Sequence, residues 1–236
     1  MPIPDPGYIF IDLPPISPEI LASYDQVPID PYMAHQTRYK RFSQYRLTLD
    51  PDDGWQFSML PHRAYSAFKK FNPVAGGILR EYLPIEVDFQ PIIKTVVDGP
   101  LPLDESVDWQ INVHQNRSVT TLDNVAPLTP EGIHQDGHEY VMISILRREN
   151  VRGGETRLWR SPDAAEPIWR GTMQPGQAVL LDDRAVWHDV TEIVPDVGEV
   201  GRRDILIVSF SRWQERWYGE EHEAAVLAGD APASSM

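Results

Sequence analysis

Cysteine is missing from the sequence altogether, and its absence excludes several kinds of site. None of the 236 residues is cysteine, so the chain can form no disulfide, thiolate zinc site, iron–sulfur cluster or cysteine nucleophile. Any metal ion that it binds must therefore be held by histidine nitrogen and carboxylate oxygen.

Positive charge and long apolar runs are also scarce. Lysine and arginine total 21 against 35 aspartates and glutamates, which gives a formal net charge of −14. Nucleic acids and anionic membrane surfaces require a basic binding surface, so we expect neither as a partner. No apolar run approaches the roughly 18 residues of a membrane span, and the first residues lack the basic region and apolar stretch of a signal peptide. We expect a cytoplasmic protein whose partner is a small molecule. The sequence does not indicate an oligomeric state.

Proline, in contrast, is abundant at the beginning of the chain. Eight of the 22 prolines fall within residues 1–31, and this density predicts an extended, turn-rich arm because proline fixes φ and lacks a backbone donor. Ser17 followed by Pro18 predicts the start of one short helix. Farther on, residues 38–47 have the alternation of a strand, and the apolar spacing of residues 64–82 predicts two short helices.

The strand predicted at 38–47 carries several cations among its aromatic residues: Arg38, Lys40, Arg41 and Arg46. Basic residues interleaved with aromatics can bind nucleic acid, but the acidic net charge of the chain argues against that function. We expect these cations to pair with the protein's own acids.

Residues 107–213 have the pattern of a succession of short strands. Each is alternating or β-branched, and the strands are separated by Gly, Pro, Asn and Asp. The predicted strands are 109–117, 132–146, 155–160, 177–181, 186–193 and 204–210. This pattern predicts a mostly β fold with flanking helices, either a sandwich or a barrel. We expect a single domain over residues 1–236, in which 1–105 form the arm and buttressing helices, 107–213 the core, and 218–236 a frayed tail.

Two histidines and one aspartate form a pattern that suits a metal ion. His134 and Asp136 lie two apart in a predicted strand, where residues i and i+2 share a face. His188 lies in a later predicted strand, which a sandwich can bring opposite the first pair. Two histidines and a carboxylate on one face of a metal leave three open positions, as in non-haem Fe(II) oxygenases. The alternative is that both histidines are core residues satisfied by hydrogen bonds.

Two arginines precede the last predicted strand, and one of them is expected to need an anionic partner. A buried guanidinium without a partner is costly, and a dicarboxylate co-substrate would supply a bidentate one. Arg203 shares its strand face with Ile205, whereas Arg202 shares its face with Asp204. Parity does not decide which face is inward. We favour Arg203 as the co-substrate ligand, with Arg202 as the second choice and pairing of Arg203 with Asp204 or Asp196 as the structural explanation.

The same segments resemble a known enzyme family. The similarity lies in the runs TPEGIHQDGHEYVMISILRRENVRGGETRLW, LLDDRAVWHDV and GRRDILIVSF. They are similar to the bacterial 2-oxoglutarate/Fe(II) dioxygenases that hydroxylate free L-amino acids, the isoleucine dioxygenase group. The similarity covers about residues 107–213, and residues 28–32 together with 38–45 also resemble the N-terminal region of that group.

The resemblance implies a fold, an activity and a set of site residues. The fold is a double-stranded β-helix, the jelly-roll or cupin-like core, with helices against one sheet. The cofactors are Fe(II), 2-oxoglutarate as co-substrate, and O2. The reaction is hydroxylation of an unactivated C–H bond of a free L-amino acid or close derivative, with release of succinate and CO2. By motif match, His134, Asp136 and His188 would be the iron ligands, and Arg203 would hold the distal carboxylate of 2-oxoglutarate.

Two other functions stay open beside this one. The same iron chemistry could act on a larger biosynthetic intermediate, with epoxidation, desaturation or rearrangement as the outcome. Alternatively, a cupin-like protein could bind the metal without catalysis, which predicts a closed coordination shell.

Gln115 and Arg117 are candidates for binding the substrate. They share strand parity with the apolar residues Ile111 and Val113, so they could point into the sandwich, where Arg117 could meet a substrate carboxylate. A solvated strand end is an equally good explanation.

Three further polar residues lie close to the predicted metal ligands. His138 shares the parity of His134 but follows Gly137, so we expect a structural role or one at the mouth of the site. The acidic pair Asp182 and Asp183 precedes the strand of the second histidine. We expect this pair to cap a turn and not to bind a second metal ion.

Overall fold

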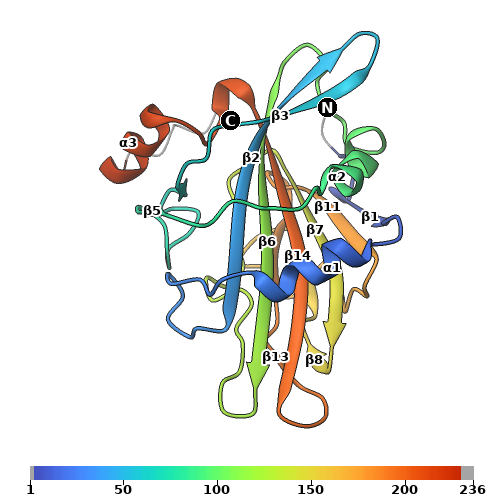
Figure 1. Cartoon of the computed structure of the whole chain (residues 1–236), viewed down its shortest axis with the longest axis vertical. Helices are drawn as coiled ribbons and strands as arrows, with labels where there is room; N and C mark the ends of the chain where they lie inside the picture. Colours follow the sequence, from blue (N-terminus) through green and yellow to red (C-terminus); the bar gives the residue numbers. More distant parts are fainter. Residues whose placement is uncertain (1–2, 230–236) are drawn as a thin grey trace.

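A seven-stranded antiparallel sheet forms the centre of the structure (Figure 1), which is a computed structural model that describes residues 3–229. The strand order is β1-β11-β7-β14-β6-β2-β3, so β14 lies at its middle. The strands are β1 (Tyr8–Asp12), β2 (Arg38–Asp50), β3 (Gly54–Met59), β6 (Trp109–Thr121), β7 (Tyr140–Glu149), β11 (Gln177–Asp182) and β14 (Val200–Arg212).

Smaller sheets and short helices complete the structure. A three-stranded sheet has the order β10-β9-β12, and two two-stranded sheets pair β13 with β8 and β4 with β5. Their strands are β4 (Tyr65–Ser66), β5 (Leu79–Arg80), β8 (Val151–Gly153), β9 (Thr156–Trp159), β10 (Trp169–Gly171), β12 (Trp187–Val190) and β13 (Ile193–Pro195). The helices are α1 (Pro18–Ser23), α2 (Gln90–Val97) and α3 (Glu220–Ala228), with 3-10 turns η1 (Tyr24–Gln26) and η2 (Trp213–Glu215). Within residues 3–229, no helix combines the length and the apolar character needed to cross a bilayer.

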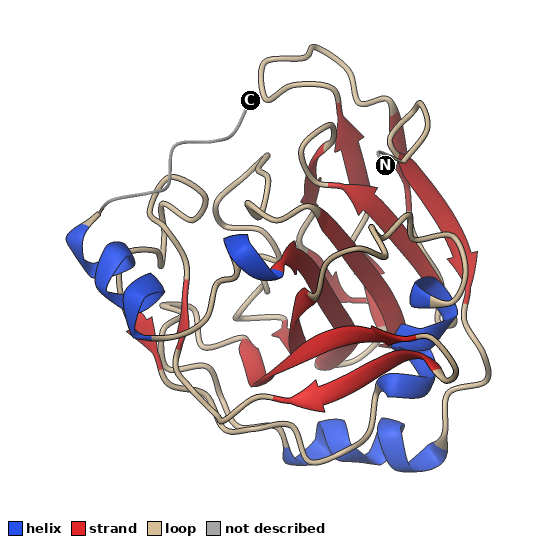
Figure 2. Cartoon of the chain, turned by 90° about the horizontal axis from the view of Figure 1, so that it is seen from above, coloured by secondary structure: helices blue, strands red, loops and turns tan. Residues whose placement is uncertain are grey.

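The central strands are buried on both faces, and successive side chains enter two different cores. The outer core lies between the large sheet and helices α1 and α2, which cross in front of it in Figure 1 and lie outside the strands in Figure 2. The inner core lies on the opposite face, where Leu158 of β9 packs with Ile143 of β7 and Ile205 of β14. The cavity described below opens on this inner face.

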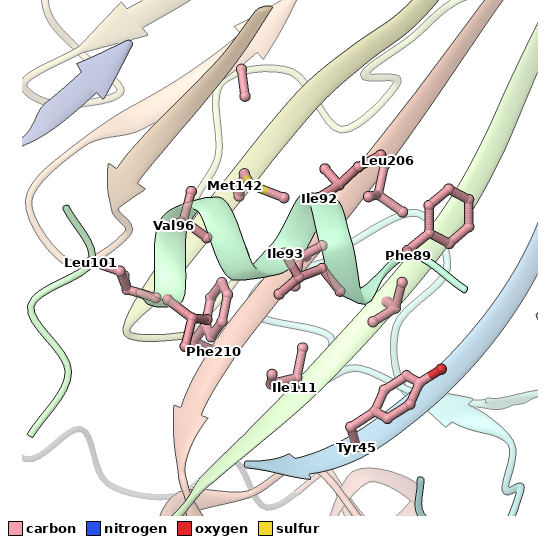
Figure 3. Close-up of a cluster of buried hydrophobic side chains, with 14 of the residues drawn as sticks. Tyr45, Phe89, Ile92, Ile93, Val96, Leu101, Ile111, Met142, Leu206 and Phe210 are labelled. Atoms are coloured by element: carbon pink, nitrogen blue, oxygen red, sulfur yellow. The ribbon is translucent and has the colours of Figure 1, made fainter. Parts of the chain in front are cut away.

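Helix α2 anchors the outer core. Ile93 and Val96 are 1% and 0% exposed, and they pack with Leu101, Leu206 and Phe210 in the cluster shown in Figure 3. Because the helix has only eight residues, its stability depends on this packing more than on helix propensity.

Phe210→Ala is expected to lower the free energy of unfolding by about 3–5 kcal/mol, because the ring is fully buried and its removal leaves a cavity. Phe10→Ala is the matched control, since Phe10 is 41% exposed and the same truncation leaves no closed cavity there. Chemical denaturation of both variants measures the difference. Equal losses for the two would contradict the placement of Phe210.

The expected helix at Pro18 is confirmed, but the two helices predicted within residues 64–82 are wrong. The Ser17 hydroxyl accepts a hydrogen bond from the backbone N–H of Ile20, at 3.2 Å, and caps α1. Residues 64–82 instead form turns and the short pair β4–β5. The aromatic residues there face different neighbours, so their three-and-four spacing does not describe one helix face.

The tail prediction is also corrected in part. Residues 220–228 form α3, and Val226 is 1% exposed because it packs against Phe68 and Trp217. Residues 230–236 of the predicted frayed tail lie outside the described residues.

The six strands predicted after residue 107 are present, with one boundary that matters for function. The strand predicted over residues 132–146 begins only at Tyr140, so His134 and Asp136 precede it. The predicted strand at 186–193 divides into β12 and β13. The mostly β class with flanking helices is confirmed.

Candidate metal centre

His134, Asp136 and His188 converge at the inner face of the large sheet. One potential ligand atom from each lies within 4.8 Å of the others. The Asp136 carboxylate is 3.7 Å from the Nε2 of His134 and 3.6 Å from the Nε2 of His188. The three residues that the sequence predicts as a metal site therefore come together, and their atoms are the nitrogen and oxygen donors of a two-histidine, one-carboxylate site.

The two histidines are placed by backbone pairing. The N–H of each donates to the carbonyl of the other, at 3.0 and 2.9 Å, in an isolated bridge between β12 and the segment before β7. This bridge sets the two rings side by side, with centroids 4.4 Å apart. The Nδ1 of His134 lies 2.9 Å from the carbonyl oxygen of Gly132. With Nδ1 donating to that oxygen, Nε2 is left as the free donor for a metal.

Asp136 is placed by a second carboxylate, that of Asp183. Asp183 accepts hydrogen bonds from the backbone N–H groups of Asp136, Gly137 and His138, at 3.0, 2.7 and 3.0 Å. The chain turns sharply here: Gly137 has φ +89°, and a Cβ on it would lie 2.6 Å from the ring of Phe71. The expectation that Asp183 serves a turn is confirmed, and that turn carries the metal ligand.

Asp183→Asn is expected to weaken metal binding about 10- to 100-fold, the range for losing an outer partner of a ligand. The three N–H groups bond to both oxygens of the carboxylate, whereas an amide has only one acceptor oxygen. At least one of these hydrogen bonds is therefore lost, and the loop that carries Asp136 is held less firmly. Asp182→Asn is the control, because that carboxylate accepts from the backbone N–H of Arg184 and not from the ligand loop. Competition with a metal chelator measures both. Equal metal affinities of the two variants would contradict this positioning role of Asp183.

The charges of the site suit a bound cation. Burial opposes charge on His134, but the neighbouring Asp136 carboxylate outweighs it and raises the pKa of His134 to about 9. Burial and the charge of His134 lower the pKa of His188 to about 4. Burial alone would raise the pKa of Asp136, but the two histidines lower it below its usual value. At neutral pH, without a metal ion, Asp136 is thus a carboxylate, His188 is a neutral imidazole and His134 carries a proton. A bound cation would take the place of that proton as the positive charge of the site.

Arg203 lines the same cavity, and its guanidinium has no partner within residues 3–229. The residue is 2% exposed, and its Nε and Nη2 atoms are buried without a hydrogen bond among the described residues. Burial, together with the charge of Arg148, lowers the pKa of Arg203 to about 9, which still leaves it charged at neutral pH. Arg202 instead points outward and pairs with Glu149 at 3.3 Å. A buried guanidinium in this position is costly without an anion beside it, so the cavity favours an anionic ligand there.

The geometry does not support the predicted substrate contacts of Gln115 and Arg117. Arg117 donates to Asp204 at 2.7 and 2.9 Å and to Asp25 at 2.7 Å, and the amide of Gln115 donates to Ser23 at 2.7 Å. Neither residue lines the metal cavity. Their parity marks a buried face, but it is the face covered by helices.

The predictions for His138 and for the cations of β2 are confirmed in part. His138 lines the cavity, its Nδ1 lies 2.9 Å from the Ser211 hydroxyl, and its ring packs at a tilt against Trp217 with centroids 4.3 Å apart. It therefore has a structural role. Three of the four cations pair with the protein's own acids as expected: Arg38 with Asp30, Arg41 with Glu86 and Arg46 with Asp108. The ammonium of Lys40 has no acid partner among the described residues.

Residues that the sequence did not indicate complete the cavity wall. They come from β6 and from the β4–β5 region: Tyr65, Arg80, His114, Asn116 and Ser118. The empty space of the cavity, including its open mouth, is about 930 Å³. The alternation of polar residues along β6, whose other face is apolar, was the available signal for its cavity-facing side.

Comparison with known proteins agrees with this site. The family model for 2OG-Fe dioxygenases matches residues 21–209, which is most of the chain. The chain belongs to the 2OG-Fe dioxygenase family. As a 2OG-Fe dioxygenase it is an enzyme whose chemistry requires Fe(II), 2-oxoglutarate and O2.

Individual relatives of this 2OG-Fe dioxygenase are distant. The chain is 22% identical over 213 residues to the 3(1)-hydroxy-L-isoleucine 4-dioxygenase of Pantoea ananatis, covering 84% of this chain and 82% of the relative. It is 24% identical over 186 residues to the L-isoleucine-4-hydroxylase of Bacillus thuringiensis, covering 75% of each.

Solved structures show the same fold. A bsmA homologue from Methylobium petroleophilum superposes with a TM-score of 0.69 at 28% identity, over 82% of this chain and 79% of the other. The IDO protein of Bacillus thuringiensis superposes with a TM-score of 0.67 at 19% identity, over 88% and 90%. The jelly-roll core expected for this 2OG-Fe dioxygenase is thereby confirmed.

Proposed function

We propose that the protein hydroxylates an unactivated C–H bond of a free L-amino acid or a close derivative. In this proposal His134, Asp136 and His188 hold Fe(II), and Arg203 holds the distal carboxylate of 2-oxoglutarate. The observation that carries it is a single cavity that contains both the three converging ligands and a buried guanidinium with no partner in the described part of the chain. Two relatives whose names describe oxidation of isoleucine or its hydroxy derivative support the substrate class.

Iron and 2-oxoglutarate would supply the oxidation, in which one oxygen atom of O2 enters the substrate while 2-oxoglutarate becomes succinate and CO2. The protein's own part is positioning and exclusion of water. Asp183 and the backbone bridge fix the three ligands. Arg203 attracts a carboxylate, while the apolar residues Ile143 and Ile205 line the cavity around it. No acid–base residue is needed in this reaction.

The test is turnover of 2-oxoglutarate to succinate with Fe(II), ascorbate and O2, in the presence of each protein amino acid in turn. We expect succinate formation above background with at least one aliphatic amino acid, together with a product heavier by one oxygen atom. Background turnover with the entire panel would reject a free amino acid as substrate. A product lacking two hydrogens, in place of one gaining oxygen, would favour desaturation.

A further inference from the structure

A second group of cations lines the metal cavity, on the wall formed by β2 and β5. Lys40 lies on the cavity-facing side of β2, and Arg80 lies in β5. They are 6% and 1% exposed. Both share the cavity with the three metal ligands, although they come from a different part of the chain.

Neither side chain has an acidic partner in the part of the chain that the structure describes. Among residues 3–229, the Nε and Nη2 atoms of Arg80 are buried without a hydrogen bond. The backbone N–H of Lys40 donates to the carbonyl of Pro28, but its side-chain ammonium makes no hydrogen bond or ion pair with these residues. Their contacts are with aromatic rings: Lys40 Nζ is 5.0 Å from the ring centre of Tyr65 and 4.8 Å from that of Tyr82, and the Arg80 guanidinium is 4.6 Å from that of Tyr65. A ring face recovers only part of the free energy that a buried cation loses on leaving water.

The acids nearby are already engaged. Asp30 binds the guanidinium of Arg38 at 2.6 Å and accepts the backbone N–H of Tyr32 at 2.9 Å. Glu131 lies on the metal side, 3.6 Å from the Nε2 of His134. Burial and the charges of Arg38 and Arg80 lower the pKa of Lys40 well below its usual value. The lowered pKa means that the protein does not fully compensate a positive charge on Lys40, and an anion bound beside it would stabilise the charged form.

This group is separate from the arginine assigned to 2-oxoglutarate. Lys40 is in register with Asn116 of β6, and Asn116 is in register with Ile205 of β14, two residues beyond Arg203. Two strand spacings across a sheet are about 10 Å. Lys40 and Arg203 thus lie on one face of the cavity, with the polar side chains of β6 between them. Their separation is comparable to the length of a small molecule.

We propose that Arg80 and Lys40 bind the carboxylate of the substrate that is oxidised. The ligand class is a small carboxylic acid. The ring of Tyr65 contacts both cations and stabilises their charge. The inference rests on the proposed function, because it places one end of an amino-acid substrate in the same cavity. Arg203 then serves the co-substrate, and the pair Arg80 and Lys40 fixes the direction in which the substrate lies.

The test compares acids with their amides under anaerobic conditions, where binding occurs without turnover. The probes are L-isoleucine, L-leucine and L-methionine, each beside its primary amide, titrated into the protein loaded with Fe(II) and 2-oxoglutarate. The wild type is expected to bind at least one acid about 10- to 100-fold more tightly than its amide, the range for charge-assisted hydrogen bonds. In Arg80→Met this preference should fall to nearly one, and Arg80→Lys should restore part of it.

Two controls keep the result specific. Lys69→Met removes one exposed cation from the same segment and should leave the preference unchanged. The affinity for 2-oxoglutarate reports on folding and on Arg203, and it should stay at the wild-type value in Arg80→Met. If that variant does not fold, Lys40→Met provides the same comparison.

The outcomes separate this inference from the proposed function. A wild type that prefers no acid over its amide, or a folded Arg80→Met that keeps the preference, overturns the carboxylate site. Product analysis in air, on the same samples, tests the reaction independently. An acid preference that depends on Arg80 without any oxidised product would support the carboxylate site and reject amino-acid hydroxylation.

Discussion

His188→Ala is expected to abolish Fe(II) binding at stoichiometric metal and to reduce substrate-dependent succinate formation to background. The loss should exceed the roughly 100-fold effect of removing an outer partner, because a direct ligand is lost. Only two protein donors would remain. The low pKa of His188, about 4, means that the wild-type imidazole is neutral and available to a metal throughout the neutral range.

His35→Ala is the matched control, since His35 is exposed and lies outside the cavity. Anaerobic competition with a chelator measures the affinity, and thermal unfolding without metal checks that the fold survives. Wild-type Fe(II) affinity in a folded His188→Ala protein would remove this residue from the ligand set, whatever the turnover. Lost affinity with an unchanged unfolding midpoint would assign the defect to ligation.

The three ligands could be predicted from the sequence, but strand geometry alone does not explain their convergence. His134 and Asp136 were expected on one face of a regular strand, but they lie in the irregular segment before β7. Their convergence depends on the backbone bridge to His188 and on the three hydrogen bonds to Asp183. The sequence motif contains the residues that make these contacts. The ligands can therefore be identified from the motif even when the contacts themselves are not known.

Strand parity could not show which buried face carried the site. Ile111 and Val113 mark the face of β6 that packs under the helices, so Arg117 on that face pairs with acids there. The cavity lies on the opposite face of β6, where it is lined by the alternate residues His114 and Asn116. When a strand is buried on both faces, its apolar residues identify a core, and the polar alternation opposite them can identify the site.

The β4–β5 region was the least predictable part of the wall. Aromatic residues spaced by three and four suggested helices, whereas their burial depends on partners distant in sequence: Phe68 packs on Trp217, and Tyr65 packs on His114. Arg80 reaches the cavity only through this long-range packing. Local periodicity carries no information about such contacts, because they are fixed by tertiary structure.

Arg203→Met is expected to raise the dissociation constant for 2-oxoglutarate about 100-fold, because truncating one side of a buried charge pair costs about 3 kcal/mol. The same change removes a buried guanidinium whose Nε and Nη2 have no protein partner, so the protein without 2-oxoglutarate should be at least as stable as the wild type. Affinity and stability are thus expected to move in opposite directions, which a general loss of structure would not produce.

Arg202→Met is the control that the chain itself offers. Its side chain is 41% exposed and pairs with Glu149 on the surface, an interaction worth about 0–1 kcal/mol, so the 2-oxoglutarate affinity should change less than about twofold. Calorimetric titration of 2-oxoglutarate into both metal-loaded variants measures the contrast. An equal loss in both, or a loss confined to Arg202→Met, would move the co-substrate away from Arg203. A loss confined to Arg203→Met would show that the inward-facing arginine of the pair binds the carboxylate, because the two positions differ in burial and in the presence of an acid partner.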